Sequence, residues 1–147
     1  MRDERDYFNV TLVELPSGDS PPGDFAFTVL RNHAVATWLH LLWQGLALST
    51  DPTVAAIAAK AVKEARYHEA HTADWVVRLG DGTDESAKRM NAALQRLWPY
   101  TAELLTSDAV DVQAKARGLG PAWGDLQAPW MQAIDAVYAR ARLVKPT

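Results

Sequence analysis

Apolar residues recur at intervals of three and four along most of this chain, which is the spacing of a helix that buries one face. In the stretch 25–48, the residues on that face are Phe27, Leu30, Ala34, Trp38, Leu41 and Leu42. Polar breaks separate this stretch from three others with similar spacing, over 52–79, 83–104 and 125–143. A short helix over 108–115 completes the pattern. The sequence therefore predicts an all-α fold.

Residues with strong boundary preferences stand between these stretches. Asp24 is placed to cap the first helix, and Asp51 to cap the second, with Pro52 in its first turn. The Gly-Asp-Gly run at 80–82 tolerates left-handed backbone and predicts the end of the second helix. Pro99 lacks a backbone N–H, so it predicts a kink about one turn earlier in the third helix.

The first 23 residues form no clear helix. The β-branched stretch 8–13 is compatible with a strand, but one strand has nothing to pair with, so we expect extended chain followed by a Pro- and Gly-rich loop over 16–23. The connectors among the first three long helices are tight, which makes those helices antiparallel neighbours. We therefore expect one helical domain over 1–147, built as an antiparallel bundle with its helices within 24–143.

Composition excludes several classes of protein. The 147 residues include no cysteine, which rules out disulfides, thiolate metal sites and a thiol nucleophile. A net charge of -3 offers no basic footprint for nucleic acid. The longest apolar stretch, 34–48, is interrupted by His40 and Gln44 and is too short to span a bilayer. We expect a cytoplasmic protein that binds neither nucleic acid nor membranes.

The second helix carries the candidate chemistry. Its predicted inward stripe consists of Val54, Ile57, Ala61, Glu64, His68, His71 or Thr72, Trp75 and Leu79. A glutamate and a histidine one turn apart on an inward face resemble the metal ligands of carboxylate-bridged di-iron bundles. Counted from the turn between the first two helices, His33 lies level with His68. The three side chains of His33, Glu64 and His68 therefore predict either a three-ligand metal site or a buried hydrogen-bonded cluster.

The remaining ligand inventory is poor for an iron pair within this chain. A di-iron bundle takes a carboxylate from each of four helices, two of them paired with histidine. Residues 25–50 contain no Asp or Glu, and the last helix has only Asp125 and Asp135, with no histidine following. The chain thus supplies one Glu-His pair rather than a set, and we expect no iron pair in this chain alone.

Six tryptophans are many for a chain of this length. Trp38 and Trp75 fit the predicted core stripes. The other four are Trp43, Trp98, Trp123 and Trp130. Because four more indoles are hard to bury together in a small bundle, we expect some of them to face a protein partner.

Several segments resemble the structural C subunit of the bacterial phenylacetyl-CoA epoxidase. The most specific are DPT at 51–53 followed by AAIAAKAVKEARYH at 55–68, and DWVVRLGDGTDES at 74–86. Shorter matches are RDER at 2–5 with Asn9 and LVE at 12–14, LW at 97–98 and TAEL at 101–104. The resemblance covers roughly residues 2–111.

This resemblance implies a ferritin-like helical bundle within a multicomponent, oxygen-dependent complex that epoxidises the aromatic ring of phenylacetyl-CoA. It also implies that the di-iron site lies in a sister subunit and that a separate reductase supplies electrons. The family's structural subunit holds the catalytic one without a working iron site of its own. On this basis the chain is expected to contain no catalytic, cofactor-binding or metal-binding residues.

Members of that family are longer, with two helices before the position of Met1 and a further segment after that of Thr147, so the chain resembles a central portion. A bundle lacking two helices exposes inner faces, and we therefore expect a two-fold homodimer that completes it. An alternative function stays open: a metal-binding ferritin-like oxidase or oxygenase, with a site of His33, Glu64 and His68 completed across the dimer.

Overall fold

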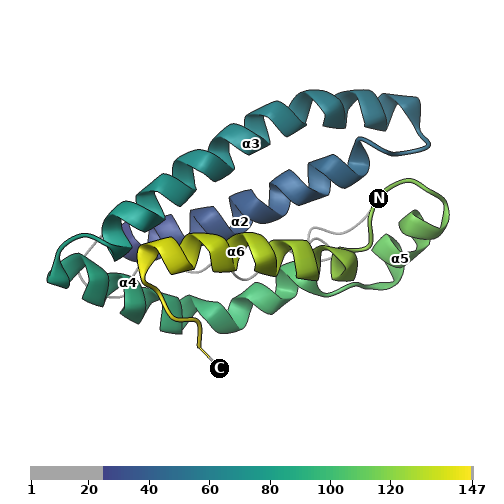
Figure 1. Ribbon diagram of the computed structural model, residues 1–147. Coiled ribbons are helices and arrows are strands. Elements are labelled where there is room, and N and C mark those ends of the chain that lie inside the picture. Colours follow the sequence, from purple (N-terminus) through teal and green to yellow (C-terminus); the bar gives the residue numbers. More distant parts are fainter. Residues whose placement is uncertain (1–24, 147) are drawn as a thin grey trace, which may run out of the picture.

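The computed structural model describes residues 25–146, and every element within that range is a helix (Figure 1). In chain order these are α2 (Phe25–Leu46), α3 (Pro52–Gly80), α4 (Asp84–Leu97), the 3-10 helix η2 (Trp98–Leu105), α5 (Ala109–Ala116), the 3-10 helix η3 (Trp123–Leu126) and α6 (Gln127–Ala141). The prediction of an all-α helical bundle is confirmed. The predicted cap at Asp24 and the predicted extended chain over 1–23 lie outside the described residues.

Helices α2 and α3 form a long antiparallel hairpin, and α6 and α4 pack against it (Figure 1). The core lies where α2, α4 and α6 meet, so α2 is the central helix. The large side chains that these three helices bury fully in the core are Phe27 and Leu30 from α2, Met90, Leu94 and Leu97 from α4, and Trp130, Ile134 and Tyr138 from α6. Within the described part of the chain, no helix is long and apolar enough to cross a membrane.

The start of α3 follows the predicted capping chemistry. The Asp51 carboxylate accepts hydrogen bonds from the backbone N–H groups of Thr53 (2.9 Å) and Val54 (3.2 Å), and Pro52 occupies the first turn. These contacts satisfy two of the amide donors that a helix leaves unpaired at its N-terminus. The turn between α2 and α3 is also tied to the rest of the chain, because the Thr50 N–H donates to the Gly118 carbonyl (2.8 Å).

The third predicted helix differs from expectation after Leu97. Instead of a kinked α-helix, the chain changes at Trp98 to 3-10 bonding, with Pro99 in the first turn of η2. The physical reason is the missing N–H of Pro99, which cannot bond to the carbonyl four residues earlier. Leu104 is nevertheless buried, so its predicted place in the core is confirmed.

The last helix is shorter than the predicted 125–143. Residues 123–126 form η3, and α6 ends at Ala141, because Arg142 adopts a left-handed conformation with φ 59°. An Asp111 carboxylate oxygen accepts a hydrogen bond from the Trp123 N–H (2.6 Å), which joins α5 to η3.

Gly80, the last residue of α3, marks a close crossing with the end of α6. A Cβ at this position would lie 2.4 Å from the Ala141 carbonyl oxygen, which is backbone and cannot rotate away. We expect Gly80→Ala to force the two helices apart and to lower the free energy of unfolding by roughly 1–3 kcal/mol in urea titration. Gly124→Ala is the control, because the nearest atom to its Cβ would be the Ser107 hydroxyl at 3.1 Å, which belongs to a side chain that can rotate. Equal free energies of unfolding for the two variants would contradict a close approach of α3 and α6 at Gly80.

Candidate functional site

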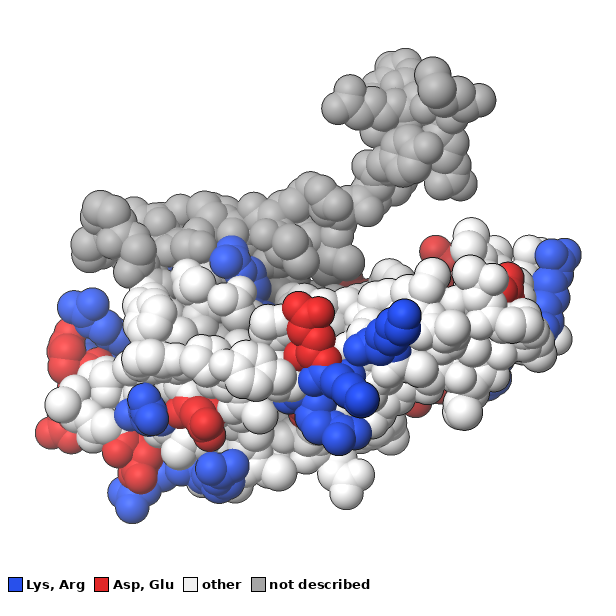
Figure 2. All heavy atoms as spheres, turned by 90° about the horizontal axis from the view of Figure 1, so that it is seen from above, with Lys and Arg blue, Asp and Glu red and all other residues white. Residues whose placement is uncertain are grey.

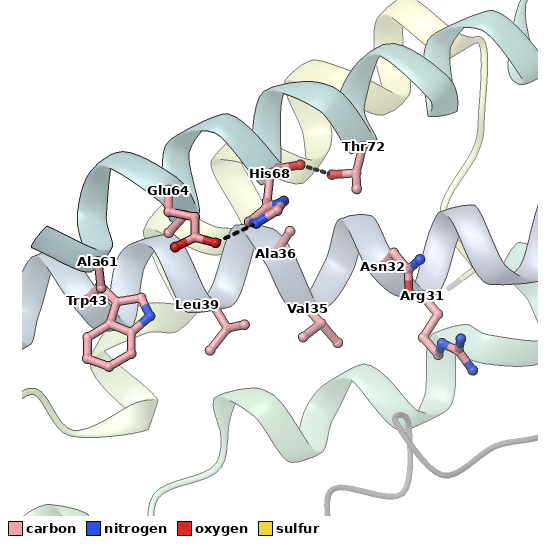
Figure 3. Close-up of a pocket in the computed structure, with 11 residues that line it drawn as sticks. Arg31, Asn32, Val35, Ala36, Leu39, Trp43, Ala61, Glu64, His68 and Thr72 are labelled. Carbon is pink, nitrogen blue, oxygen red and sulfur yellow. Dashed lines mark hydrogen bonds and ion pairs between the residues drawn. The ribbon is translucent and has the colours of Figure 1, made fainter. Parts of the chain in front are cut away.

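A groove runs between α2 and α3, with a cavity of about 530 Å³ (Figure 3). Helix α2 lines it with the apolar side chains of Val35, Leu39 and Trp43. Helix α3 contributes Glu64 and His68, which lie side by side on the groove in Figure 3. Arg31 and Asn32 line one end of the same α2 wall, so that wall is apolar only beyond them, and the other wall carries an acid and a base.

Glu64 and His68 contact each other in solvent rather than in the core. His68 Nε2 lies 3.4 Å from Glu64 Oε1, and the side chains of His68 and Glu64 are 57% and 79% exposed. The Thr72 hydroxyl donates to the His68 carbonyl (2.9 Å), which is a local helix contact. An exposed pair at this distance contributes little to stability. The prediction that Glu64 and His68 lie on the core-facing seam is wrong.

The buried face of α3 is rotated by about one residue from the predicted stripe, which corresponds to about 100° around the helix. Each buried residue follows a predicted one: Ala58 follows Ile57, Ala65 follows Glu64, Ala73 follows Thr72, Val76 follows Trp75 and Gly80 follows Leu79. Four of these five are alanine or glycine, and such small residues let α3 approach its neighbours closely. Of the predicted stripe, Trp75 and Leu79 are partly buried and pack against the core, as predicted. Ile57 is exposed, and Glu64 and His68 border the groove.

His33 lies in the core of the bundle, away from this pair. Its side chain is fully buried on α2, and within residues 25–146 neither ring nitrogen has a hydrogen-bond partner. An aromatic neighbour is Tyr138 of α6, at 6.3 Å between ring centroids, whose buried hydroxyl likewise has no partner there. Burial disfavours the charged imidazole and lowers the pKa of His33 from 6.5 to about 4.

The structure thus brings Glu64 and His68 together but does not bring His33 to them. The predicted hydrogen-bonded cluster of all three is not formed, because equal distance from a turn does not place side chains on the same face. Among the described residues, no group of three or more His, Cys, Asp or Glu side chains could hold a metal ion. A site shared between two chains stays a prediction.

A second histidine-carboxylate pair was not predicted from the sequence. His40 Nδ1 of α2 is in close contact with Glu69 Oε2 of α3, and both side chains are largely buried between the two helices. The signal was present, since His40 interrupts the most apolar stretch of the chain. This pair joins the two arms of the hairpin and is a structural contact.

The tryptophans are better buried than expected. Trp130 is fully buried, so it is not among the tryptophans that could face a partner. Trp98 packs beside it at 5.9 Å, and Trp123 meets Trp38 edge-to-face at 4.9 Å between ring centroids. These contacts occur because the two 3-10 helices hold their indoles against the core. Trp43 is the member of the predicted group that lines the groove.

The surface charge does not single out another site on the face seen from above. Figure 2 shows acidic and basic side chains occurring together on that face, without a broad area of one sign.

Fold and groove together define a helical-bundle protein whose two longest helices form an apolar recess with a polar rim. The protein family described as "Phenylacetic acid catabolic protein" matches residues 1–147, and the chain belongs to this family. The chain is also 40% identical over 145 residues to the C subunit of 1,2-phenylacetyl-CoA epoxidase from Escherichia coli (strain K12). That match covers 99% of this chain and 56% of the relative, so the chain spans little more than half the relative's length.

Proposed function

We propose that this chain is a structural subunit of a multicomponent phenylacetyl-CoA epoxidase, acting in aerobic phenylacetate degradation. The observation that carries this proposal is the 40% identity, across nearly the whole chain, to the C subunit of such an epoxidase. In this proposal the chain holds a catalytic subunit that contains the di-iron site. A ferritin-like relationship of the bundle and a cytoplasmic location belong to the same proposal.

The residues of this chain do not fit an iron pair, which supports a non-catalytic role. Such a centre needs carboxylates that project inward from four helices. No Asp or Glu occurs in residues 25–50, which include all of α2. Glu64 and His68 face solvent, while His33 is buried without a partner among the described residues. We therefore assign the oxygen chemistry to the partner subunit and derive no step of it for this chain.

One end of the molecule offers a surface for that partner. The turn between α2 and α3 and the short helix α5 lie at the same end (Figure 1). Leu48 in the turn and Val110 and Val112 on α5 are exposed there, and α5 has no buried residue. Exposed apolar side chains of this kind are typical of protein interaction sites. We propose that they contact the catalytic subunit.

Co-purification with the catalytic subunit tests the proposal. We expect the tagged chain to retain that subunit and to be required for full phenylacetyl-CoA turnover. Val110→Glu should weaken the complex by about tenfold or more, because it places a charge in an apolar contact. Val144→Glu is the matched control, since Val144 is 74% exposed and Val110 is 70% exposed. Failure of the unmodified chain to retain the catalytic subunit would overturn the proposal.

Glu64→Gln separates a structural from a catalytic role. If the chain is structural, turnover of the reconstituted complex should stay unchanged, because Glu64 handles no substrate or metal. Complete loss of turnover with the fold and the complex intact would show that Glu64 takes part in the reaction.

A further inference from the structure

Helix α5 is attached to the bundle without an apolar anchor. It has no buried residue, whereas each of the other α-helices in the described part of the chain buries at least four. Its apolar side chains Val110 and Val112 are 70% and 51% exposed. A helix of eight residues is too short to be stable in water by itself. The contacts at its two ends must therefore hold it in place.

Polar contacts centred on Asp111 join the start of α5 to η3. One carboxylate oxygen of Asp111 accepts a hydrogen bond from the Asp108 N–H, and the other accepts one from the Trp123 N–H, both at 2.6 Å. Beside them, the Ser107 hydroxyl accepts from the Gly124 N–H (2.8 Å). Desolvation acts to raise the pKa of Asp111, but these backbone hydrogen bonds outweigh it and hold the pKa at about 2. The carboxylate is therefore ionised at neutral pH, and both of its oxygens are acceptors.

The end of α5 is joined to the turn between α2 and α3. The Thr50 N–H donates to the Gly118 carbonyl (2.8 Å), and the Thr50 hydroxyl donates to the Arg117 carbonyl (3.2 Å). Gly118 has φ 74°, and a Cβ there would lie 2.6 Å from the Thr50 methyl group. Both ends of α5 are thus fixed by backbone contacts, and its apolar side chains are left exposed.

The two exposed valines lie on opposite flanks of α5. Asp111 stands between them in the sequence and faces η3, so Val110 and Val112 each lie about 100° around the helix from it, on either side. Helix α5 lies at one end of the molecule (Figure 1) and forms a ridge there. A partner that covers both valines must enclose the ridge on both flanks, which requires an apolar cleft rather than a flat surface.

We propose that α5 inserts as a ridge into an apolar cleft of the catalytic subunit, and that Asp111 is the positioning residue that holds α5 in the orientation for insertion. This inference rests on the proposed function, which supplies the catalytic subunit as the partner. Because α5 is fixed before binding, less conformational entropy is lost on association.

A second copy of this chain fits the ridge less well than a different subunit does. Two copies related by a two-fold axis bring the same surface patch together. Ridge would then meet ridge, and the contact would bury one flank of each α5 while leaving the other flank exposed. A different chain can instead offer a cleft that covers both valines.

Isothermal titration of the catalytic subunit with the full chain tests the role of Asp111. Asp111→Asn keeps the shape of the side chain but replaces one acceptor oxygen by an NH₂ group, which cannot accept from a backbone N–H. We expect the Kd to rise about tenfold or more, with the helical circular dichroism of the bundle retained. Asp125→Asn is the matched control, because Asp125 contacts Lys115 of α5 only through an exposed ion pair (2.6 Å). Its Kd should equal that of the unmodified chain.

An engineered disulfide separates positioning from direct contact with the partner. A Cβ at Gly124 would lie 4.0 Å from the Ser107 Cβ, within the range that a disulfide spans. The chain has no other cysteine. Adding Ser107→Cys and Gly124→Cys to Asp111→Asn should restore the Kd of the unmodified chain when the pair is oxidised, and dithiothreitol should abolish the rescue. A residue that contacted the partner directly would not be rescued in this way.

Val112→Glu tests the cleft, because Val112 lies on the flank opposite Val110. We expect it to raise the Kd about as strongly as Val110→Glu does. An unchanged Kd for Val112→Glu would overturn the cleft, and an unchanged Kd for Asp111→Asn, or no rescue by the disulfide, would overturn the role of Asp111.

The unmodified chain distinguishes failure of this inference from failure of the proposed function. If it binds the catalytic subunit while the α5 variants bind equally well, only the inference is overturned. If it does not bind that subunit, both are overturned. If the valine variants instead dissociate a dimer of the chain alone, a second copy occupies α5 and the inference is overturned.

Discussion

Lowering the pH from 7 to 4 is expected to destabilise the folded chain by roughly 3 kcal/mol through His33 alone. The imidazole is fully buried, and burial lowers its pKa from 6.5 to about 4. Between these two values the unfolded chain binds a proton that the folded chain does not. The contribution of neutral His33 to the free energy of unfolding is therefore fully present above pH 6.5. It decreases as the pH drops below 6.5 and is lost near pH 4.

His33→Met isolates this contribution from the carboxylates, which also titrate in acid. Methionine fills a similar volume without a titratable group, so urea unfolding of the variant should depend much less on pH between 6.5 and 4. At pH 7 we expect the variant to be at least as stable as the parent chain, because it removes two buried ring nitrogens without hydrogen-bond partners in the described structure. The same pH slope in both proteins would show that His33 does not titrate as its burial requires.

Trp130→Ala is expected to lower the free energy of unfolding by about 3–5 kcal/mol. The indole is fully buried on α6 and packs against Trp98, so its removal leaves a cavity in the centre of the bundle. Its N–H also donates to the Ala34 carbonyl of α2 (3.0 Å), which joins two helices far apart in the sequence. Chemical denaturation followed by circular dichroism measures the loss.

Trp130→Phe separates packing from hydrogen bonding at the same position. Phenylalanine keeps part of the ring contact but cannot donate to Ala34, so we expect a smaller loss of roughly 1–3 kcal/mol. A loss below about 1 kcal/mol for Trp130→Ala would mean that the bundle does not depend on the α2–α6 contact.

The helices were predictable because their signals are local. The Asp51 cap, the Pro52 start and the three- and four-residue spacing act within a turn or two, and α3 begins where they indicate. Helix type after Leu97 was less predictable, since Pro99 permits either a kinked α-helix or a change to 3-10 bonding. Packing against the rest of the bundle decides between such outcomes, and local sequence does not report it.

The orientation of α3 was mispredicted for a related reason. Hydrophobicity favours Ile57 as a core residue, whereas the structure exposes it and buries Ala58 beside it. Trp75 does pack against the core, but it is only partly buried and its neighbour Val76 is fully buried. Close helix packing selects small side chains, and alanine occurs around most of the circumference of α3, so pattern alone cannot identify the buried side. The predicted placement of Glu64 and His68 in the core depended on which side of α3 is buried. The predicted contact of these two side chains with His33 depended on the same choice.

The two histidine-carboxylate pairs of this chain differ in their surroundings. His40 and Glu69 join the two arms of the hairpin, whereas Glu64 and His68 contact each other in solvent. Neither pair has a third ligand to complete a metal site within the described residues.

The metal content of the purified chain tests the proposed non-catalytic role most directly. The chain would be loaded with ferrous iron without oxygen, desalted and analysed by elemental mass spectrometry. We predict a negligible ratio of iron to chain. A ratio of about one or more would contradict a structural role, and Glu64, His68 and His33 would then be the first residues to mutate.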